Sequence, residues 1–362
     1  MRIRRNQFHI FLVIILVLLA LTSCSNAEAP KAASKDSSQT TVVDYMGRSV
    51  EVPKKINRIA CLYAYTGHVV TMLGEGKKIV AVNNGLKRDT LLGEINPAIK
   101  DALVPNTSDK INIEELANAA PDVIFIQESL AKNDGEVRKL EELKIPYLVV
   151  NFNSIKEQQQ SIAMIGKAIG RSDRAEKFNE FYKEVITQVS AKVKDIPEKN
   201  RVRVYHSVME ATRTDTKDSL PAEWMKVAGA VNVSAGENLK IIENKYFANL
   251  EQILLWDSDV ILVNEDGVAD YILNSKPWQS LKAVKNKKVY QMPNGVSRWG
   301  HPGGLETPLA ILWTAKTLYP DRFKDTDMTE VTAKFYKDFF DYNPAPEMIE
   351  KILSGKDMRT PK

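Results

Sequence analysis

The chain has 362 residues, of which 44% are hydrophobic and 27% are charged, and its formal net charge is +4. This is the balance of a globular protein that is long enough for two domains with hydrophobic cores. Three positive charges belong to Arg2, Arg4 and Arg5, so the rest of the chain is close to neutral. A nucleic-acid partner is not indicated, because no basic stripe is present.

Residues 1–23 have the pattern of a bacterial signal peptide. The basic start is followed by an apolar run over 10–21, which is short for a plain transmembrane anchor, the alternative interpretation. Leu21-Thr22-Ser23-Cys24 then fits the lipobox, in which the cysteine is acylated and becomes the mature N-terminus. We therefore predict a lipid anchor at Cys24. Residues 24–40 have little apolar content and predict a flexible tether.

Residues 41–170 predict an N-terminal α/β lobe. A small hairpin is expected over 41–52, and an alternation of strands and helices follows, which is typical of a parallel sheet with right-handed crossovers. The segment 85–110, with its two prolines, is expected to be irregular and long enough to carry function. The predicted strands are 58–62, 78–83, 122–127 and 147–150, and the predicted helices are 67–73, 113–119, 136–143 and 155–169.

A long amphipathic helix is predicted over 174–194, within a joining segment at 171–197. Asp173 is the expected N-cap and Glu176 completes a capping box, while Pro197 ends the helix. At about 1.5 Å per residue the helix is about 30 Å long, the width of a small domain. Its apolar stripe has three- and four-residue spacings and consists of Ala175, Phe178, Phe181, Tyr182, Val185, Val189 and Val193.

Residues 198–362 predict a C-terminal α/β lobe with additional helices at its end. One part of it repeats the first lobe: Asn112-Ile113-Glu114-Glu115-Leu116 with a later Asp-Val-Ile is matched by Asn249-Leu250-Glu251-Gln252-Ile253 with Asp-Val-Ile at the same spacing. We interpret this as an internal duplication, although a chance match is the alternative. The other predicted strands are 202–208 and 288–292, and the predicted helices are 222–228, 278–284, 304–318, 331–340 and 347–353.

Several motifs in matching order resemble the substrate-binding proteins of ABC importers for iron complexes and vitamin B12. The resemblance covers residues 41–355 and implies two doubly wound α/β lobes with parallel sheets, joined by one rigid helix (class III periplasmic-binding-protein-like), with the ligand in the cleft between them. The motifs that carry it are Asp44-Tyr45-Met46-Gly47-Arg48, Leu73-Gly74 with Ile79-Val80-Ala81-Val82, both Glu…Asp-Val-Ile segments, Lys276-Pro277-Trp278-Gln279-Ser280-Leu281, and the run from Leu312-Trp313 to Pro320.

Three histidines, His68, His206 and His301, each follow or approach the end of a predicted strand, at the edge that faces the inferred cleft. Imidazole is a common ligand of transition metals. They are therefore candidates for contact with a metal complex, and direct coordination of a bare metal ion by all three is a further possibility. The alternative for each is an ordinary hydrogen-bonded loop histidine.

Aromatic and arginine side chains near these histidines suit a bulky, flat or anionic ligand, by stacking and by paired hydrogen bonds. We expect Trp299 on an exposed loop, because Arg298 and a glycine flank it. Tyr63 and Tyr205 could instead be core residues at strand ends. With the histidines, the candidate ligand residues are Tyr63, Tyr65, Arg88, Tyr205, Arg213, Arg298 and Trp299.

Glu114 and Glu251 occupy matching positions in the two repeats. The helix dipole alone explains an acidic residue at a helix start. The family resemblance implies a second role, since the corresponding glutamates of relatives dock one from each lobe into arginine pockets of a permease dimer.

The sequence therefore predicts an exported, lipid-anchored, monomeric solute-binding protein with no intrinsic cofactor. It would deliver a ligand to the permease dimer of an ABC importer with a cytoplasmic ATPase, at the outer face of the cytoplasmic membrane or in the periplasm of a bacterium or archaeon. A ferric siderophore is the first candidate ligand, haem or a corrinoid the second, and a bare metal ion or oxyanion the third. No enzyme motif is present, and the remaining rival is an exported metalloenzyme that uses the three histidines.

Overall fold

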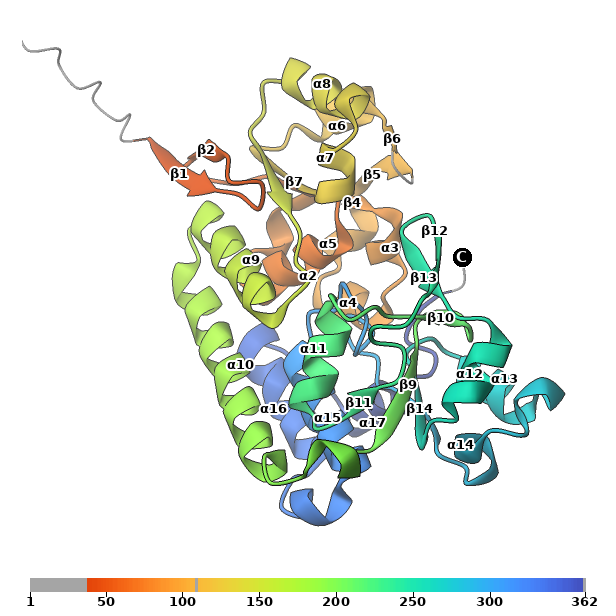
Figure 1. Ribbon diagram of the computed structural model, residues 1–362. Helices are drawn as coiled ribbons and strands as arrows, with labels where there is room; N and C mark the ends of the chain where they lie inside the picture. The colour runs from red at the N-terminus through yellow and green to blue at the C-terminus, as the bar shows by residue number, and fades with distance from the viewer. Residues whose placement is uncertain (1–37, 108–109, 361–362) are drawn as a thin grey trace, which may run out of the picture. The chain divides into compact units, whose positions relative to one another are not determined.

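Two mainly parallel β-sheets form the framework of the computed structural model, which describes residues 38–107 and 110–360 (Figure 1). The predicted signal peptide, with Cys24, lies outside the described residues. One sheet falls on each side of the predicted joining segment, as expected for an α/β protein with two lobes. The boundaries of these lobes stay a prediction. Within the part of the chain that the structure describes, no helix has the length and apolar content that a membrane crossing requires.

The sheet of the first lobe has the order β6-β5-β4-β3-β7-β8, with only the β5–β6 pair antiparallel. Its central strands are apolar runs buried on both faces, as a parallel sheet covered by helices requires. The strands are β3 (Ile59–Cys61), β4 (Ile79–Asn83), β5 (Leu103–Thr107), β6 (Lys110–Ile111), β7 (Val123–Gln127) and β8 (Tyr147–Val150). The helices are α2 (Ala64–Met72), α6 (Ile113–Ala119), α7 (Glu128–Ala131), α8 (Asp134–Glu142) and α9 (Ile155–Ala168). A hairpin of β1 (Gln39–Val43) and β2 (Ser49–Pro53) precedes the lobe.

The expectation that 85–110 is irregular is wrong. The segment folds into three short helices and a strand, because the side chain of Asn83 accepts a hydrogen bond from the Leu86 N–H (3.2 Å) and starts the first helix. Leu86 and Leu91 are then fully buried. Short turns between the helices conceal this apolar spacing in the sequence. The helices are α3 (Asn84–Lys87), α4 (Thr90–Ile95) and α5 (Ala98–Asp101).

The second lobe has a smaller parallel sheet of order β11-β9-β14-β15 and a separate antiparallel sheet of order β10-β13-β12. The antiparallel sheet was not predicted, and it turns at Glu243 and Asn244, both with positive φ. The strands are β9 (Arg203–Ser207), β10 (Arg213–Thr214), β11 (Val231–Asn232), β12 (Lys240–Ile242), β13 (Lys245–Phe247), β14 (Val260–Val263) and β15 (Val289–Gln291). The helices are α11 (Leu220–Val227), α12 (Leu250–Trp256), α13 (Val268–Asn274), α14 (Lys282–Lys285), α15 (Thr307–Leu318), α16 (Met328–Phe340) and α17 (Pro346–Ser354).

The long helix α10 (Ser172–Val193) lies between the two sheets in the chain and packs against α9, α11 and α15 (Figure 1). Its predicted apolar stripe is buried except for the half-buried Phe181. The predicted N-cap is wrong: the helix begins at Ser172, Arg171 takes the cap position without a side-chain bond, and Asp173 lies in the first turn. There its negative charge still suits the helix dipole.

One continuous hydrophobic core joins the two lobes. Phe125 of β7, Leu262 of β14 and Phe178 of α10 all belong to the same buried apolar cluster. The ring of Phe178 lies 5.2 Å from that of Phe339 in α16, centroid to centroid, in an edge-on arrangement. The helices at the end of the chain therefore pack against the joining helix as well as the second lobe, and α16 also contacts α2 of the first lobe.

The two predicted repeats adopt the same local structure. Each helix, α6 and α12, ends at a residue in the left-handed conformation, Ala120 and Asp257. Each following aspartate, Asp122 and Asp259, accepts a backbone N–H from the start of a neighbouring strand segment, Arg58 (2.9 Å) and Arg203 (3.0 Å). The repeat thus places α6 and α12 in equivalent positions on the two lobes.

Candidate functional site

A cavity of about 520 Å³ lies where the parallel strands of both sheets end. Tyr63 follows β3, Gln127 ends β7 and Asn151 follows β8, while Val208 follows β9 of the second lobe, and all four line the cavity. This is the edge at which α/β sheets bind their ligands. A larger surface hollow of about 840 Å³ near α11 adjoins the cavity and shares Asn153, Asp218 and Ser219 with it. None of the four strand-end residues lines this hollow, so we take the cavity as the candidate site.

Six of the predicted ligand residues line this cavity: Tyr63, Tyr65, His68, Arg213, Arg298 and His301. Four do not. The expectation that Trp299 is exposed is wrong, since it is fully buried in the shared core. Tyr205 is a core residue whose hydroxyl donates to the Ala211 carbonyl (2.9 Å), and His206 is fully buried behind Asp215. Arg88 donates to the Thr360 carbonyl (2.9 Å) outside the cavity.

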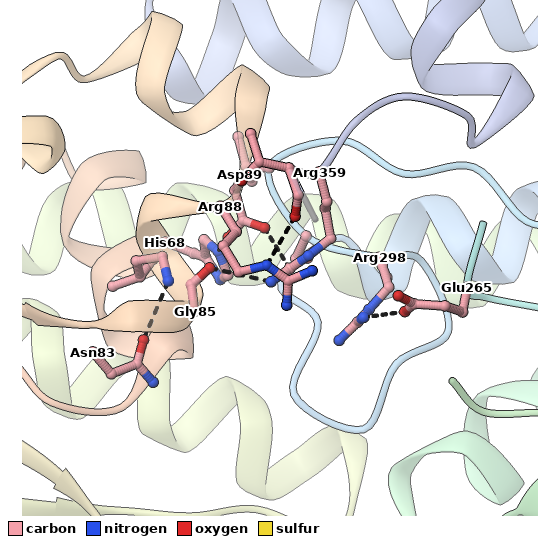
Figure 2. A network of polar contacts seen from close by, with 12 residues as sticks. His68, Asn83, Gly85, Arg88, Asp89, Glu265, Arg298 and Arg359 are labelled. Atoms are coloured by element: carbon pink, nitrogen blue, oxygen red, sulfur yellow. Dashed lines mark hydrogen bonds and ion pairs between the residues drawn. The ribbon is translucent and has the colours of Figure 1, made fainter. Parts of the chain in front are cut away.

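Three guanidinium groups meet at the cavity, from Arg213 of β10, Arg298 and Arg359. Arg298 forms an ion pair with Glu265, and Arg359 forms one with Asp89 (Figure 2). Among the described residues no carboxylate lies within ion-pair distance of Arg213, whose Nη1 is 3.1 Å from the Met209 sulfur. Burial lowers the pKa of both Arg213 and Arg298. Two acids, Asp215 and Asp218, also line the cavity, where four basic side chains including Lys245 outnumber them.

His301 is a neutral hydrogen-bond donor in this setting. Its Nδ1 accepts the Gly303 N–H (3.0 Å), so the neutral ring carries its proton on Nε2. Burial holds the pKa of His301 well below its ordinary value, and the positive charges of Arg298, Arg213 and Arg359 lower it further. At neutral pH the ring thus offers an N–H without adding a charge.

A buried carboxylate shapes the loop between β15 and α15 that carries Arg298 and His301. Glu306 accepts the backbone N–H groups of Val296 (2.9 Å) and Ser297 (2.8 Å), and it also pairs with the Tyr336 hydroxyl. Burial raises the pKa of Glu306. The loop also needs glycine at Gly295, because a Cβ there would lie 1.8 Å from the Tyr336 oxygen.

The histidines do not form a metal site. The Nε2 of His68 lies 3.0 Å from Asp89, and the Nδ1 of His206 lies 2.5 Å from Asp215. Across residues 38–107 and 110–360, no group of three or more His, Cys, Asp or Glu side chains is arranged to hold a metal ion. The hypothesis that His68, His206 and His301 coordinate one bare ion is therefore wrong for these positions, because each ring turns to a separate partner.

Glu114 and Glu251 lie on the surface rather than in the cavity. Both are exposed, and each belongs to the first turn of its helix, α6 or α12. Their placement agrees with either interpretation, a helix start or a docking contact.

Sequence reasoning missed Arg359 and the hairpin residues Lys245 and Tyr246, all of which line the cavity. Arg359 lies far from every other site residue in the sequence, in a short stretch without a recognisable motif. The sequence did contain a signal for the hairpin. The polar residues Glu243-Asn244-Lys245 separate the apolar pairs Ile241-Ile242 and Tyr246-Phe247, which is typical of a tight turn.

Comparisons with known proteins agree with this geometry. Residues 59–295 match the model of a family described as Periplasmic binding protein. The chain is 26% identical to the molybdate-binding protein MolA of Haemophilus influenzae, over 84% of this chain and 92% of MolA. It is 25% identical to YvrC of Bacillus subtilis, an uncharacterised ABC transporter substrate-binding lipoprotein, over 89% of this chain and 100% of YvrC.

Two further similarities extend this picture. The chain is 22% identical to the iron(3+)-hydroxamate-binding protein YxeB of Bacillus subtilis, over 77% of this chain and 86% of YxeB. The structure matches the solved structure of MolA bound to molybdate with a TM-score of 0.76 at 24% identity, covering 84% of this chain and 99% of that one. At this identity, the structural match shows a common fold.

Proposed function

Because the chain belongs to the periplasmic binding protein family, we propose that it captures a small oxyanion of the molybdate class in the cleft and hands it to an ABC importer. At the broader level, the chain is a solute-binding protein of ABC importers, a class that works with permease and ATPase partners. The fold and the relatives are those of transport proteins and not of enzymes, which overturns the metalloenzyme hypothesis.

The observation that carries the ligand proposal is the meeting of Arg213, Arg298 and Arg359 at one cavity. Guanidinium groups bind oxyanions through paired, charge-assisted hydrogen bonds. Arg213 makes no ion pair with a carboxylate among the described residues, although nearby acids, Asp215 first among them, act on its charge from farther away, so its hydrogen-bond donors are available to an anion. A cationic ligand such as a bare metal ion would meet repulsion from all three groups.

Unpartnered donors support the same ligand. The Tyr65 hydroxyl and the Nε atoms of Arg298 and Arg359 are buried without a hydrogen-bond partner, and all three residues line the cavity. Buried donors are normally paired, so these groups favour an acceptor-rich occupant. An oxyanion has only acceptor atoms and would also take the N–H of His301. The similarity to MolA, a molybdate-binding protein by name, adds independent support.

A ferric siderophore is the second candidate, and the size of the cavity favours it. About 520 Å³ lies within the range of pockets for organic ligands of moderate size. Tyr63 and Tyr65, with ring centroids 5.9 Å apart, also offer aromatic surface to such a ligand. The similarity to YxeB, named as an iron(3+)-hydroxamate binder, agrees with this alternative.

Calorimetric titration tests the proposal. We expect the full-length protein to bind molybdate and tungstate at one-to-one stoichiometry, and the Arg213→Gln variant to bind about ten- to a hundredfold more weakly. Arg322→Gln is the matched control, since Arg322 pairs with Asp195 outside the cavity and should not matter. Absence of oxyanion binding, together with a charge-transfer band on adding a ferric hydroxamate, would replace molybdate by the siderophore, and a Soret band would indicate haem.

The remaining parts of the function are proposals of the same kind. We propose a lipid anchor at Cys24 on the outer face of the membrane, and docking of Glu114 and Glu251 on the permease. The name of YvrC, a substrate-binding lipoprotein, supports the anchor. The exposed, equivalent positions of the two glutamates support the docking.

A further inference from the structure

A short segment after α17 links the two lobes a second time. Residues 355–360, which we call the strap, leave the second lobe and pair with the first. The carbonyl of Met358 accepts the Thr90 N–H (3.0 Å), and the Thr360 N–H donates to the Arg88 carbonyl (3.0 Å). This pairing forms an antiparallel bridge between Arg359 and Asp89.

The other end of the strap is held by the second lobe. Asp357 donates its N–H to the side chain of Asp266 (3.0 Å), and the ammonium of Lys356 lies 3.2 Å from Asp270. Between these contacts Met358 is 1% exposed and belongs to the shared core. The strap is therefore fastened on both sides of the cleft.

Arg359 turns its side chain into the site. Its Nη2 donates to the Gly85 carbonyl (3.1 Å), and its Nη1 pairs with Asp89, whose other oxygen lies 3.0 Å from His68 (Figure 2). The Nε of Arg359 is buried without a partner, and the residue lines the cavity. Contacts with the first lobe thus fix the guanidinium and leave one of its donors unused.

The positive charge of Arg359 acts on Arg298, which belongs to the opposite lobe. Both residues line the same cavity, so their two positive charges repel each other, and the charge of Arg359 adds to burial in lowering the pKa of Arg298. Glu265 and Asp89 each compensate one of them. An anion in contact with both guanidinium groups would replace repulsion with attraction across the cleft.

Resting on the proposed function, we infer that Arg359 is a specificity-determining residue for doubly charged oxyanions and that its contact with the anion tightens the strap onto the first lobe. The unused Nε–H of Arg359, its fixed position beside Gly85 and Asp89, and its place opposite Arg298 carry this inference. The strap then couples occupancy of the cavity to both lobes. The helix α10 does not supply this coupling, because no residue of α10 lines the cavity.

The test compares a dianion and a monoanion of similar tetrahedral shape, tungstate and perrhenate. In the full-length protein, Arg359→Gln should weaken tungstate binding about ten- to a hundredfold and perrhenate binding less, because the lost contact acts on the second charge. Arg359→Lys keeps the charge but lacks the rigid fork of donors with which Arg359 contacts Gly85 and Asp89 at the same time. Its affinity for tungstate should therefore lie between those of the wild type and Arg359→Gln. Lys351→Gln is the matched control, since it removes one positive charge from an exposed position on α17, outside both the strap and the cavity.

Hydrogen exchange supplies a second measurement. Tungstate should slow exchange of the Thr90 and Thr360 amides in the wild type and in Lys351→Gln, and should do so less in Arg359→Lys. Should Arg359→Gln fail to fold, Arg359→Lys decides the matter by the same two measurements. Suppose that the wild type binds tungstate and that the Arg359 variants keep its affinity, its selectivity and its hydrogen exchange. This result would overturn the inference and leave the proposed function standing. A wild type that binds no oxyanion would overturn both.

Discussion

Asn112 and Asn249 make the same hydrogen bond at the start of two equivalent helices. The side-chain oxygen of Asn112 accepts the Glu115 N–H (3.1 Å), and that of Asn249 accepts the Gln252 N–H (2.7 Å). These caps fix the first turn of each helix and with it the exposed Glu114 and Glu251. The two carboxylates therefore have matching local positions on the two lobes, as docking on a dimeric permease requires.

The first prediction tests this docking role. The double variant Glu114→Lys with Glu251→Lys should abolish uptake in cells, because two attractive contacts become repulsive. Ligand affinity measured on the purified variant should stay unchanged, since neither residue lines the cavity. Loss of a favourable helix charge should cost about 0.3–1 kcal/mol of stability at each position.

A matched control for docking is the reversal of two exposed acids on α10, Glu176→Lys with Glu184→Lys. That variant should transport normally. Normal uptake by the first double variant, at normal protein levels, would leave Glu114 and Glu251 as helix starts without a role in docking.

The second prediction concerns the anchor. Cys24→Ala should abolish lipid labelling and leave an uncleaved precursor or protein released from the membrane, because the lipobox cysteine is the residue that is acylated. Metabolic labelling with palmitate and fractionation of cells measure both effects. A correctly trimmed variant that stays on the membrane would contradict the lipid anchor.

The third prediction separates packing from binding on the loop that follows β15. Trp299→Ala should reduce the free energy of unfolding by about 3–5 kcal/mol, since it removes a fully buried side chain. His301→Ala, two residues on, should cost much less stability but weaken molybdate binding. Denaturant titration and calorimetry on both variants check this, and a stable Trp299→Ala with lost affinity would reverse the assignment.

The fourth prediction is a pH dependence. In the free protein, burial and the nearby arginines hold the pKa of His301 well below 6.5, and a bound anion raises it by favouring the imidazolium. Binding then takes up a proton, so molybdate affinity should rise as pH falls through the pKa that His301 has in the complex, by no more than about tenfold per pH unit for one proton. Titrations at micromolar molybdate from pH 8 to 5.5 measure it.

The His301→Gln variant should flatten this pH profile, because it keeps a hydrogen-bond donor but cannot take up the proton. Identical profiles for the variant and the wild type would assign the effect to another group.

The fifth prediction concerns the buried carboxylate behind the site. Glu306→Ala leaves the N–H groups of Val296 and Ser297 without an acceptor, at about 1–3 kcal/mol for each buried group. Molybdate affinity should fall as well, since the loop carrying Arg298 and His301 loses its anchor. Glu350→Ala, an exposed residue of α17, is the control and should change neither quantity.

Periodicity predicted most of the fold. A helix buried on one face needs apolar residues at helical spacing, as in the stripe from Ala175 to Val193. A strand buried on both faces needs a continuous apolar run, as at Val123 and Val260. The repeat at Asn112 and Asn249 was equally visible, because capping needs particular residue types at fixed spacing.

The site was less predictable, because its residues meet through tertiary structure alone. Trp299 has the local sequence of an exposed loop, yet it is fully buried in the core cluster to which Leu309 of α15 and Phe335 of α16 also belong. This burial depends on residues distant in the sequence, so the neighbours of Trp299 do not indicate it. Arg359 reaches the cavity only through a bridge to Asp89. His206 does not line the cavity, because it is fully buried and its Nδ1 pairs with Asp215, which does line it.

The bridge between Asp89 and Arg359 also has a consequence for biogenesis. A chain is synthesised from its N-terminus, so the strands β3 to β8 are complete when residue 150 has emerged, but Arg359 arrives more than two hundred residues later. An early-folded first lobe would lack all three arginines of the site, and Arg359 is the last of them to arrive. On the proposed role of Arg359, full ligand affinity therefore arises only after residue 359 has joined the fold.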